Sequence, residues 1–343
     1  MPAPPRKILI TRTDRIGDVI LSLPTVHAIK QARPDAHVTF LVAEPVAPIV
    51  RMCPWVDDYL TTGPGEPVRS LAARLRAESF DAAICLYPRA AIARSLRAAG
   101  IPLRVGTSRR WYSLLFNRRV PVSRAQGPHH ESVYNMMILS GLPMPLVAPV
   151  KPVCEPPDDA MREARIILGE HGIAPDADGF VVVHPGCGGS ARNWGWHRYR
   201  ELIERLHMDG RRVVITGSSA EAPAADKLAA GMDAGATVLA GRTDLETLTA
   251  ILKMATVFVG PSTGPMHLAA AAGTPVVALF GPVRNTTPDR WGPLGDGHKV
   301  FMPPVPVCDC KVNQCQRGDC MDLIKVEEVA NTVIEKLTGD LGK

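Results

Sequence analysis

The sequence predicts an α/β protein built from two doubly wound, Rossmann-like domains that face a central cleft. Apolar, β-branched runs alternate with helical patterns along most of the chain, as expected for parallel sheets covered on both faces. A stretch with six prolines lies between Gly141 and Asp158 and divides this series in two. The length of 343 residues is enough for two domains with separate cores. We therefore expect one domain over 1–150 and a second over 151–343.

The first half contains four predicted strands, which cover Lys7–Thr11, His37–Ala43, Asp57–Thr61 and Asp81–Tyr87. A polar loop follows the first strand, and apolar residues at helical spacing then predict a helix over 18–32. Asp18 stands at the start of this helix, where a helix cap would explain it. A carboxylate at the end of a strand, facing the cleft, can alternatively act as a general base.

The second half repeats this architecture without a clear repeat of the sequence. Its predicted strands include Phe180–His184, Arg212–Thr216 and Thr237–Ala240. Helices are predicted near 159–171, 198–208, 223–230 and 245–254. In open α/β sheets, ligands bind beyond the carboxyl ends of the strands, so the loops that follow these strands are the candidate ligand-binding segments.

The stretch Thr256–Pro282 reads as strand, turn, helix, strand. Pro265 suits the first turn of the helix, because its missing N–H would have no partner there. Ser262, Thr263 and Gly264 therefore lie where free backbone N–H groups and the positive end of the helix dipole converge. This arrangement can hold a phosphate or diphosphate. A simple N-cap on a packed crossover helix is the alternative.

Three other loops in the second half also end strands. The loop 184–190 is rich in glycine but lacks the GxGxxG spacing of a dinucleotide fingerprint. Arg192, just beyond it, is either a phosphate clamp or a surface cation. Glu221 either accepts hydrogen bonds from ribose hydroxyls or interacts with a helix dipole. The loop 241–244 is a candidate base pocket.

Positive charge is concentrated in one segment, although the net charge is only +5. No Asp or Glu occurs from Ala82 to His130, whereas nine arginines do. Because arginine binds phosphate and carboxylate with two parallel hydrogen bonds, the segment indicates an anionic partner. Nucleic-acid-binding modules are absent, so an anionic glycan or lipid surface is favoured over nucleic acid. The alternative is a basic surface that is solvated and binds no partner.

The eight cysteines and the N-terminus bear on the compartment. We find no secretory signal and no membrane-spanning segment, so we expect a cytoplasmic protein with reduced thiols or a metal site. The cysteines at positions 308, 310, 315 and 320 crowd into one segment, which suggests zinc. Their spacing is not a standard zinc pattern, and reduced thiols are favoured.

Six motifs, in order, resemble glycosyltransferase family nine, the ADP-heptose:lipopolysaccharide heptosyltransferase family. They are ILITRTDRIGDVILSLPTVHAIK, HPGCGGSARNW, ITGSSAE, LAGRTDLETL, VGPSTGPMHLAAAAGTPVVALFGP and CMDLIKVEEV, and they span nearly the whole chain. The resemblance implies a GT-B fold, with the acceptor on the first domain and the nucleotide-sugar donor on the second. It also implies an inverting single displacement without a metal ion or a resident cofactor.

The resemblance assigns roles to individual residues. Asp18 matches the proposed catalytic base, which deprotonates the acceptor hydroxyl. Donor binding is assigned to Arg192, Glu221, Thr243, Leu245, Ser262, Thr263, Gly264 and His267. Among these, Thr243 and Leu245 lie where the nucleobase is expected, and His267 either contacts phosphate or braces the turn. From the basic segment and the first loop we assign acceptor binding to Arg15, Arg89, Arg109 and Arg110.

Two positions depart from the family pattern. Ser262 stands where heptosyltransferases commonly have Asp, and Arg192 where they commonly have Lys. Arginine keeps the charge, but serine does not replace a carboxylate that reads sugar hydroxyls, so the donor sugar is open.

We therefore expect a transferase that moves a sugar, with heptose from ADP-heptose favoured, onto the lipopolysaccharide inner core. It would work in the cytoplasm, in peripheral contact with the inner membrane and without a nucleic-acid partner. The alternatives are another nucleotide-sugar donor, a nucleotide-sugar epimerase, and a non-catalytic module that binds a nucleotide sugar or glycan.

Overall fold

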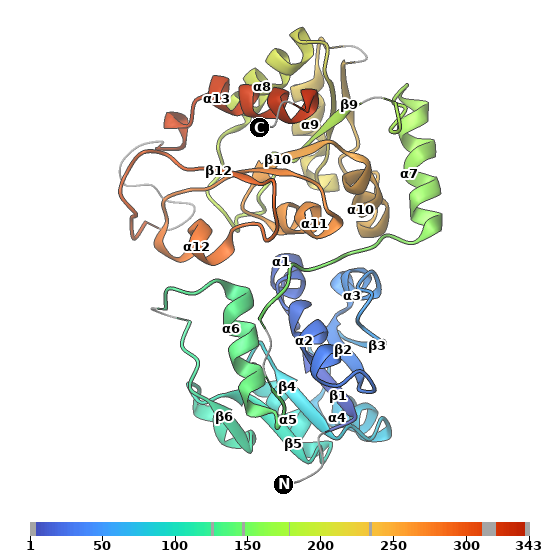
Figure 1. Ribbon diagram of the computed structural model, residues 1–343, viewed down its shortest axis with the longest axis vertical. Coiled ribbons are helices and arrows are strands. Elements are labelled where there is room, and N and C mark those ends of the chain that lie inside the picture. Colours follow the sequence, from blue (N-terminus) through green and yellow to red (C-terminus); the bar gives the residue numbers. More distant parts are fainter. Residues whose placement is uncertain are drawn as a thin grey trace. The chain divides into compact units, whose positions relative to one another are not determined.

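The computed structural model describes residues 5–124, 127–145, 148–177, 179–232, 235–310 and 320–339. The chain forms two compact units, Met1–Cys154 and Glu155–Lys343, so the division falls within the proline-rich stretch (Figure 1). Within the described ranges, every helix is too short or too polar to cross a lipid bilayer.

The first unit contains a six-stranded parallel sheet. Its strands are β1 (Lys7–Thr11), β2 (His37–Ala43), β3 (Asp58–Thr62), β4 (Ala82–Cys85), β5 (Leu103–Thr107) and β6 (Arg118–Val120). The strand order is β3-β2-β1-β4-β5-β6, and Ile8 of β1 pairs with Val38 on one side and Ala82 on the other. The four predicted strands are present. We did not predict β5 and β6, because their arginines hide the apolar alternation.

The helices of this unit are α1 (Ile16–Ile20), α2 (Pro24–Ala32), α3 (Ala47–Arg51), α4 (Val68–Ala77), α5 (Ala90–Ala98) and α6 (Glu131–Ile138), with short 3₁₀ turns η1 (Glu44–Val46), η2 (Trp111–Leu115) and η3 (Leu139–Gly141). The single helix predicted over 18–32 is wrong, since the segment forms α1 and α2. Pro24 begins α2, because proline cannot donate the backbone hydrogen bond that would continue α1.

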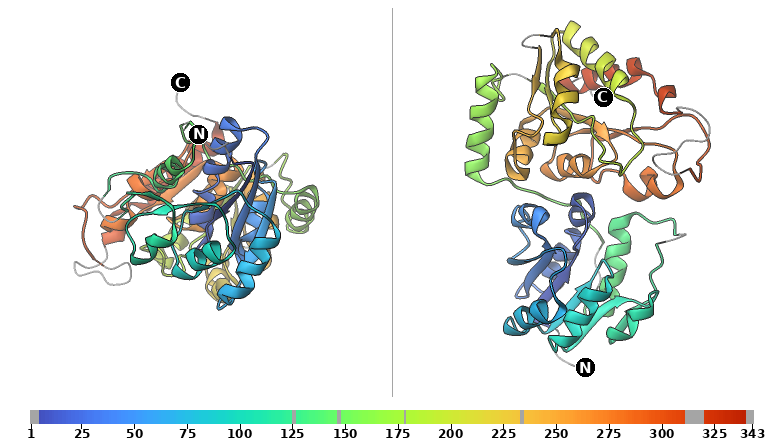
Figure 2. Two further views of the ribbon diagram at one scale, coloured as in Figure 1. Left: turned by 90° about the horizontal axis from the view of Figure 1, so that it is seen from below. Right: turned by 180° about the vertical axis from the view of Figure 1, so that it is seen from behind.

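Helices α4 and α5 cover one face of the first sheet. Leu75 and Leu96 from these helices pack with Leu9, Leu41 and Ala83 from the strands in one buried cluster. The views in Figure 2 show helices on both sides of the sheet. Each strand of the sheet centre is therefore buried on both faces, which explains its continuous apolar run.

The second unit contains another six-stranded parallel sheet. Its strands are β7 (Phe180–Val183), β8 (Arg212–Ile215), β9 (Ala236–Val238), β10 (Val257–Pro261), β11 (Val276–Leu279) and β12 (Lys299–Phe301). The order β12-β11-β10-β7-β8-β9 reproduces that of the first sheet when the strands are counted from β7. In both sheets the strand order therefore reverses direction beside the first strand, between β1 and β4 and between β7 and β10. Ligands of doubly wound folds bind at this switch point.

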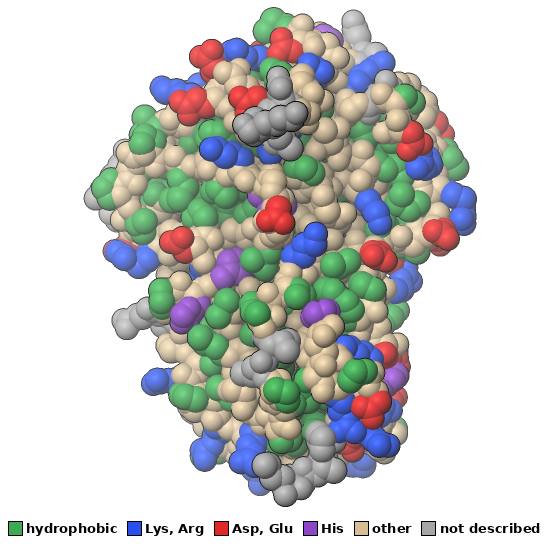
Figure 3. Space-filling view, in the orientation of Figure 1, with side chains coloured by type: hydrophobic (Ala, Val, Ile, Leu, Met, Phe, Trp, Pro, Cys, Tyr) green, Lys and Arg blue, Asp and Glu red, His purple; other side chains and the backbone are tan. Residues whose placement is uncertain are grey.

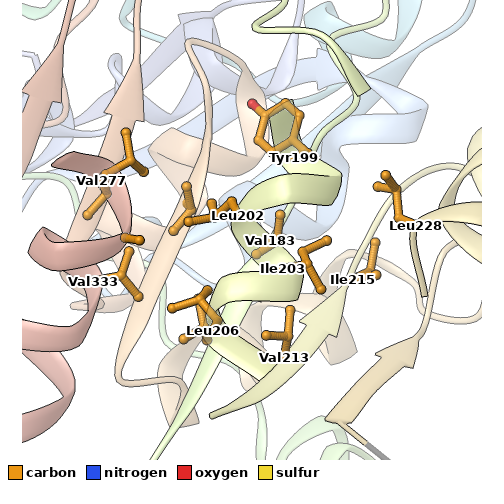
Figure 4. Close-up of a cluster of buried hydrophobic side chains, with 14 of the residues drawn as sticks. Val183, Tyr199, Leu202, Ile203, Leu206, Val213, Ile215, Leu228, Val277 and Val333 are labelled. Carbon is orange, nitrogen blue, oxygen red and sulfur yellow. The ribbon is translucent and has the colours of Figure 1, made fainter. Parts of the chain in front are cut away.

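The helices of the second unit are α7 (Asp158–Glu170), α8 (Trp196–Met208), α9 (Ala222–Ala229), α10 (Leu245–Met254), α11 (Gly264–Ala272), α12 (Pro288–Trp291) and α13 (Val326–Thr338), with 3₁₀ turns η4 (Ser219–Glu221), η6 (Arg284–Thr286) and η7 (Cys320–Leu323). Figure 4 shows the core between the sheet and the helices α8, α9 and α13, where Val183 and Ile215 meet Leu202, Leu228 and Val333.

Candidate active site

The helix α11 begins at the switch point of the second unit. Thr263 is its N-cap, and Pro265 lies in its first turn as predicted. The Thr263 side chain does not cap the helix, because its hydroxyl contacts the carbonyl of Pro261 at 3.4 Å. The amides of the first turn and the positive helix end therefore remain available for an anion. His267 is buried in the second turn, with 4% of its surface exposed.

A buried, uncharged histidine forms the neighbouring wall of this site. His184 directly follows β7, and its Nδ1 lies 3.0 Å from the hydroxyl of Thr216, which follows β8. Burial lowers the pKa of His184 to about 4, against the opposing effect of Glu221, so the ring is neutral at physiological pH. Gly260 in β10 makes room for it, since a Cβ there would lie 2.9 Å from the His184 carbonyl oxygen. His184 therefore provides a hydrogen-bonding side chain at this position without a charge.

Glu221 closes the loop that follows β8. Its Oε2 accepts hydrogen bonds from the backbone N–H and the hydroxyl of Ser218, each at 2.8 Å. Its Oε1 faces Gly186, where a Cβ would lie only 2.0 Å away. The close approach of Gly186 explains why the loop after β7 is rich in glycine. Glu221 is thus held at the carboxyl edge of the sheet, with one oxygen used by its own turn.

The other predicted donor-binding residues also lie at this edge. Arg192 packs its stem against Gly281, just beyond β11, where a Cβ would come within 2.5 Å of the Cβ of Arg192. Thr243 and Leu245 flank Asp244, which caps α10 by accepting the N–H of Thr247 at 2.8 Å. Ser262 and Gly264, on either side of Thr263, are half-buried. All eight predicted donor-binding positions therefore follow the carboxyl ends of strands in one sheet.

The first unit holds a buried charge network at its own switch point. Arg12 directly follows β1 and is only 3% exposed. Its guanidinium bonds to Asp14 at 2.8 Å, to Glu131 at 3.2 Å and to the Asn135 side chain at 3.0 Å, and it also donates to Asp18. One buried arginine thus pairs with three carboxylates, so its charge is compensated and the network carries an excess of negative charge.

Asp18 is positioned by this network rather than by a helix cap. The N-cap of α1 is Arg15, and Asp18 lies in the first turn of the helix. Its Oδ1 accepts the hydrogen bond from Arg12, and no hydrogen bond to its Oδ2 occurs within the described residues. The cap interpretation of Asp18 is therefore wrong. One oxygen of Asp18 is oriented by Arg12, and the other accepts no hydrogen bond from the described residues.

The two ionisable groups nearest Asp18 have shifted pKa values. Burial alone would lower the pKa of Arg12, but Asp14, Asp18 and Glu131 together raise it, so Arg12 is charged at every accessible pH. Burial raises the pKa of Asp14 to about 6, and the nearby Asp18 acts in the same direction, whereas Arg12 opposes both. Asp14 therefore exchanges its proton close to neutral pH, next to the candidate base.

A second arginine, Arg124 in the loop between β6 and α6, supports the network. Arg124 donates from Nε to Glu131 at 2.8 Å and from its guanidinium to Asn135 at 2.8 Å. Asn135 in turn donates to the Leu21 carbonyl at 3.0 Å, which ties α6 to the segment after α1. We predicted no role for Arg12, Glu131 or Asn135 from the sequence. The one available signal was Glu131 itself, the acidic residue that ends the acid-free segment.

The predicted acceptor arginines are exposed on the same unit. Tyr87 follows β4, and its ring centre lies 5.6 Å from the guanidinium carbon of Arg12 and 5.1 Å from that of Arg89. Arg89 is thereby linked to the buried network. Arg15, Arg109 and Arg110 are exposed, and the last two follow the carboxyl end of β5. These positions suit contacts with an anionic ligand.

The cysteine cluster lies partly outside the described residues. Cys308, Cys310 and Cys320 are half-buried, and Cys315 falls in the undescribed range 311–319. Across the described ranges, three or more His, Cys, Asp or Glu side chains never converge in an arrangement that could hold a metal ion.

Comparison with known proteins connects this geometry to one family. Residues 68–320 match the model of glycosyltransferase family 9 (heptosyltransferase). The chain is 27% identical over 283 residues to lipopolysaccharide heptosyltransferase 3 of Escherichia coli strain K12, covering 77% of this chain and 79% of that protein.

Two solved structures show the same fold. The glycosyltransferase family 9 protein of Veillonella parvula superposes with a TM-score of 0.87 at 19% identity, covering 97% of this chain and 98% of that one. The E. coli ADP-heptose lipopolysaccharide heptosyltransferase II gives 0.79 at 22% identity, covering 97% and 99%. The architecture is the predicted GT-B type, with two Rossmann-like units. Because the family model spans most of the chain, this protein belongs to glycosyltransferase family 9, the heptosyltransferases.

Proposed function

We propose that this protein transfers heptose from ADP-heptose to the lipopolysaccharide inner core. The second unit would bind the donor and the first unit the acceptor. The relative named above is a lipopolysaccharide heptosyltransferase, and one of the two solved structures is that of an ADP-heptose lipopolysaccharide heptosyltransferase. The observation that carries the proposal is Asp18, a carboxylate oriented by the buried Arg12 at the switch point of its sheet.

In the proposed mechanism, the Oδ2 atom of Asp18 takes the proton of the acceptor hydroxyl. The hydroxyl oxygen attacks the anomeric carbon as the bond from that carbon to the diphosphate breaks, which inverts the configuration. Arg12 keeps the carboxylate oriented toward the hydroxyl. The exposed arginines Arg15, Arg89, Arg109 and Arg110 would bind the phosphates and acidic sugars of the acceptor.

The leaving diphosphate gains negative charge in this step. The N-terminal amides of α11 and the guanidinium of Arg192 would stabilise it, so the reaction would need no metal ion. Glu221 would bind the ribose, and the loop with Thr243 and Leu245 the base. His267, buried behind the first turn, would contact phosphate or brace the turn. Ser262 supplies a hydroxyl rather than a carboxylate near the donor sugar.

The test is a thermal-shift comparison of ADP, UDP and GDP, followed by a transfer assay with ADP-heptose, all in the presence of EDTA. A nucleotide at about 100 times its Kd stabilises the native protein by about 2.7 kcal/mol, which is a clear rise in Tm. We expect ADP to give the largest rise and ADP-heptose to support transfer to an inner-core acceptor.

Preference for UDP or GDP would contradict the donor assignment. Loss of transfer on adding EDTA would contradict the metal-independent mechanism. Product formed from the donor alone, without acceptor, would indicate an epimerase.

A further inference from the structure

The 3₁₀ turn η2 presents two large apolar side chains to solvent. Trp111 is 74% exposed and Leu114 is 75% exposed. Because a 3₁₀ helix has three residues per turn, residues three apart lie on the same side, one above the other. The two side chains therefore form one outward face, in the teal segment between β5 and β6 in Figure 1.

The opposite side of η2 is anchored to the unit. Tyr112 and Ser113 are buried, and Tyr112 packs in the cluster beneath α4 and α5. The Tyr112 hydroxyl donates to the Pro88 carbonyl, and the Ser113 hydroxyl donates to the Thr107 carbonyl at 2.5 Å. These bonds hold η2 to the segment that follows β4 and to the last residue of β5. The apolar face is thus held outward on a fixed support.

Positive charge surrounds this apolar face. The guanidinium of Arg94 lies 5.9 Å from the Trp111 ring centre, and the exposed Arg109 and Arg110 directly precede it. In the described part of the chain, none of these three arginines forms an ion pair, and no acidic residue occurs between Ala82 and His130. On the face shown in Figure 3, the unit with the N-terminus carries blue basic side chains beside green apolar ones.

We propose that the face of η2, defined by Trp111, Leu114 and the flanking Arg94, Arg109 and Arg110, docks on an anionic lipid bilayer. Tryptophan favours the headgroup level of a membrane, and leucine inserts just below it. Arginines beside them bind lipid phosphates. The inference rests on the proposed function, because a lipid-linked acceptor is what brings the enzyme to a membrane.

The position of η2 in the unit agrees with this role. Its anchor points, Pro88 beyond β4 and Thr107 at the end of β5, lie at the carboxyl ends of these strands, the sheet edge at which Asp18 follows β1. Docking through η2 would therefore bring the candidate base toward the lipid surface that holds the acceptor. The other strongly exposed apolar residues lie outside this arginine-rich segment. Ile166 lies on α7, a helix with an acidic first turn, and Met208 is the last residue of α8.

The test is co-sedimentation of the full-length protein with vesicles of phosphatidylglycerol and phosphatidylcholine, with neutral phosphatidylcholine vesicles as a comparison. We expect binding to the anionic vesicles and little binding to the neutral ones. The double variant W111S/L114S should bind at least about tenfold more weakly, since both inserted side chains are lost. R94E should also weaken binding, whereas the matched variants I166S and M208S should bind like the wild type.

Equal binding by W111S/L114S and the wild type would overturn the proposal. So would equal loss in I166S and M208S, or self-association of the wild type that W111S/L114S abolishes in sedimentation velocity without any change in lipid binding. Neither nucleotide sugar nor acceptor is present in this assay. Failure of the donor assignment, read from the ADP thermal shift of the same preparations, is therefore distinguishable from failure of the lipid surface.

Discussion

The two sheets share one strand order, but their carboxyl edges carry opposite chemistry. In the first unit, Arg12 lies buried among Asp14, Asp18 and Glu131. In the second unit, the corresponding switch point between β7 and β10 carries the neutral His184 and the first turn of α11. The shared topology fixes where a ligand would bind, and the side chains at each edge decide what can be done to it.

This difference suits a division of labour. A network of paired charges can orient a base and hold it through proton transfer, although burying it is costly. Backbone amides and glycines can bind a diphosphate closely without introducing a competing acid or base. The contrast predicts that substitutions in the first unit change chemistry and stability, whereas those in the second change donor affinity.

The largest effect is expected for Asp18→Asn. The substitution preserves the size of the side chain but removes its capacity to accept a proton, so the transfer rate should fall about a thousandfold. Donor affinity, measured by calorimetry with ADP, should be unchanged. Glu78→Gln is the control, since Glu78 pairs with Lys7 outside the network. Near-normal turnover by the Asn variant would remove Asp18 from the mechanism.

The next effect is on stability. Arg12→Ala removes the cation that Asp14, Asp18 and Glu131 share, and leaves only Glu131 paired, through Arg124, so the free energy of unfolding should fall by about 3–5 kcal/mol. Arg74→Ala removes an exposed pair with Glu66 and should cost less than about 1 kcal/mol. Urea unfolding of the three proteins measures both. Equal losses of unfolding free energy in the two variants would show that the buried network stabilises the protein no more than an exposed ion pair does.

Asp14 should give the protein a pH dependence within the same network. Its pKa is raised in the folded state to about 6, so the folded protein binds the proton more tightly than the unfolded chain. The resulting stability is complete below about pH 4, the pKa in the unfolded chain, and is lost as the pH rises through about 6, up to about 3 kcal/mol in all. Asp14→Asn should remove this loss. Parallel wild-type and variant curves of unfolding free energy from pH 4 to 7 would contradict it.

The smallest effect tests the second unit. In Gly186→Ala the new methyl group would displace Glu221 from its turn, and we expect donor affinity to fall about tenfold. The maximal transfer rate should change little. Gly169→Ala is the matched control, because a Cβ at Gly169 in α7 meets nothing within 4 Å. A lower rate with unchanged affinity would break the proposed division between the two units.

Much of the fold could be predicted from local patterns. The alternation of strands and helices, the helix start at Pro265 and the location of the predicted donor-binding positions after strands all follow from residues close together in the sequence. The misplaced helix over 18–32 shows the limit of periodicity alone, because Pro24 interrupts an otherwise regular apolar pattern. The strands β5 and β6 were not predicted, because arginines occupy positions where the strand pattern requires apolar residues.

The sequence by itself determined the α/β class and the family, and it predicted an anionic partner for the arginine-rich segment. Only the tertiary structure decided that Asp18 is held by Arg12 and that Arg12 is held by Glu131, which lies 119 positions away. The physical reason is that strand order brings such residues together. Parallel strands need long crossover connections, so the partners of a buried charge come from distant segments whose local sequences carry no mark of the pairing.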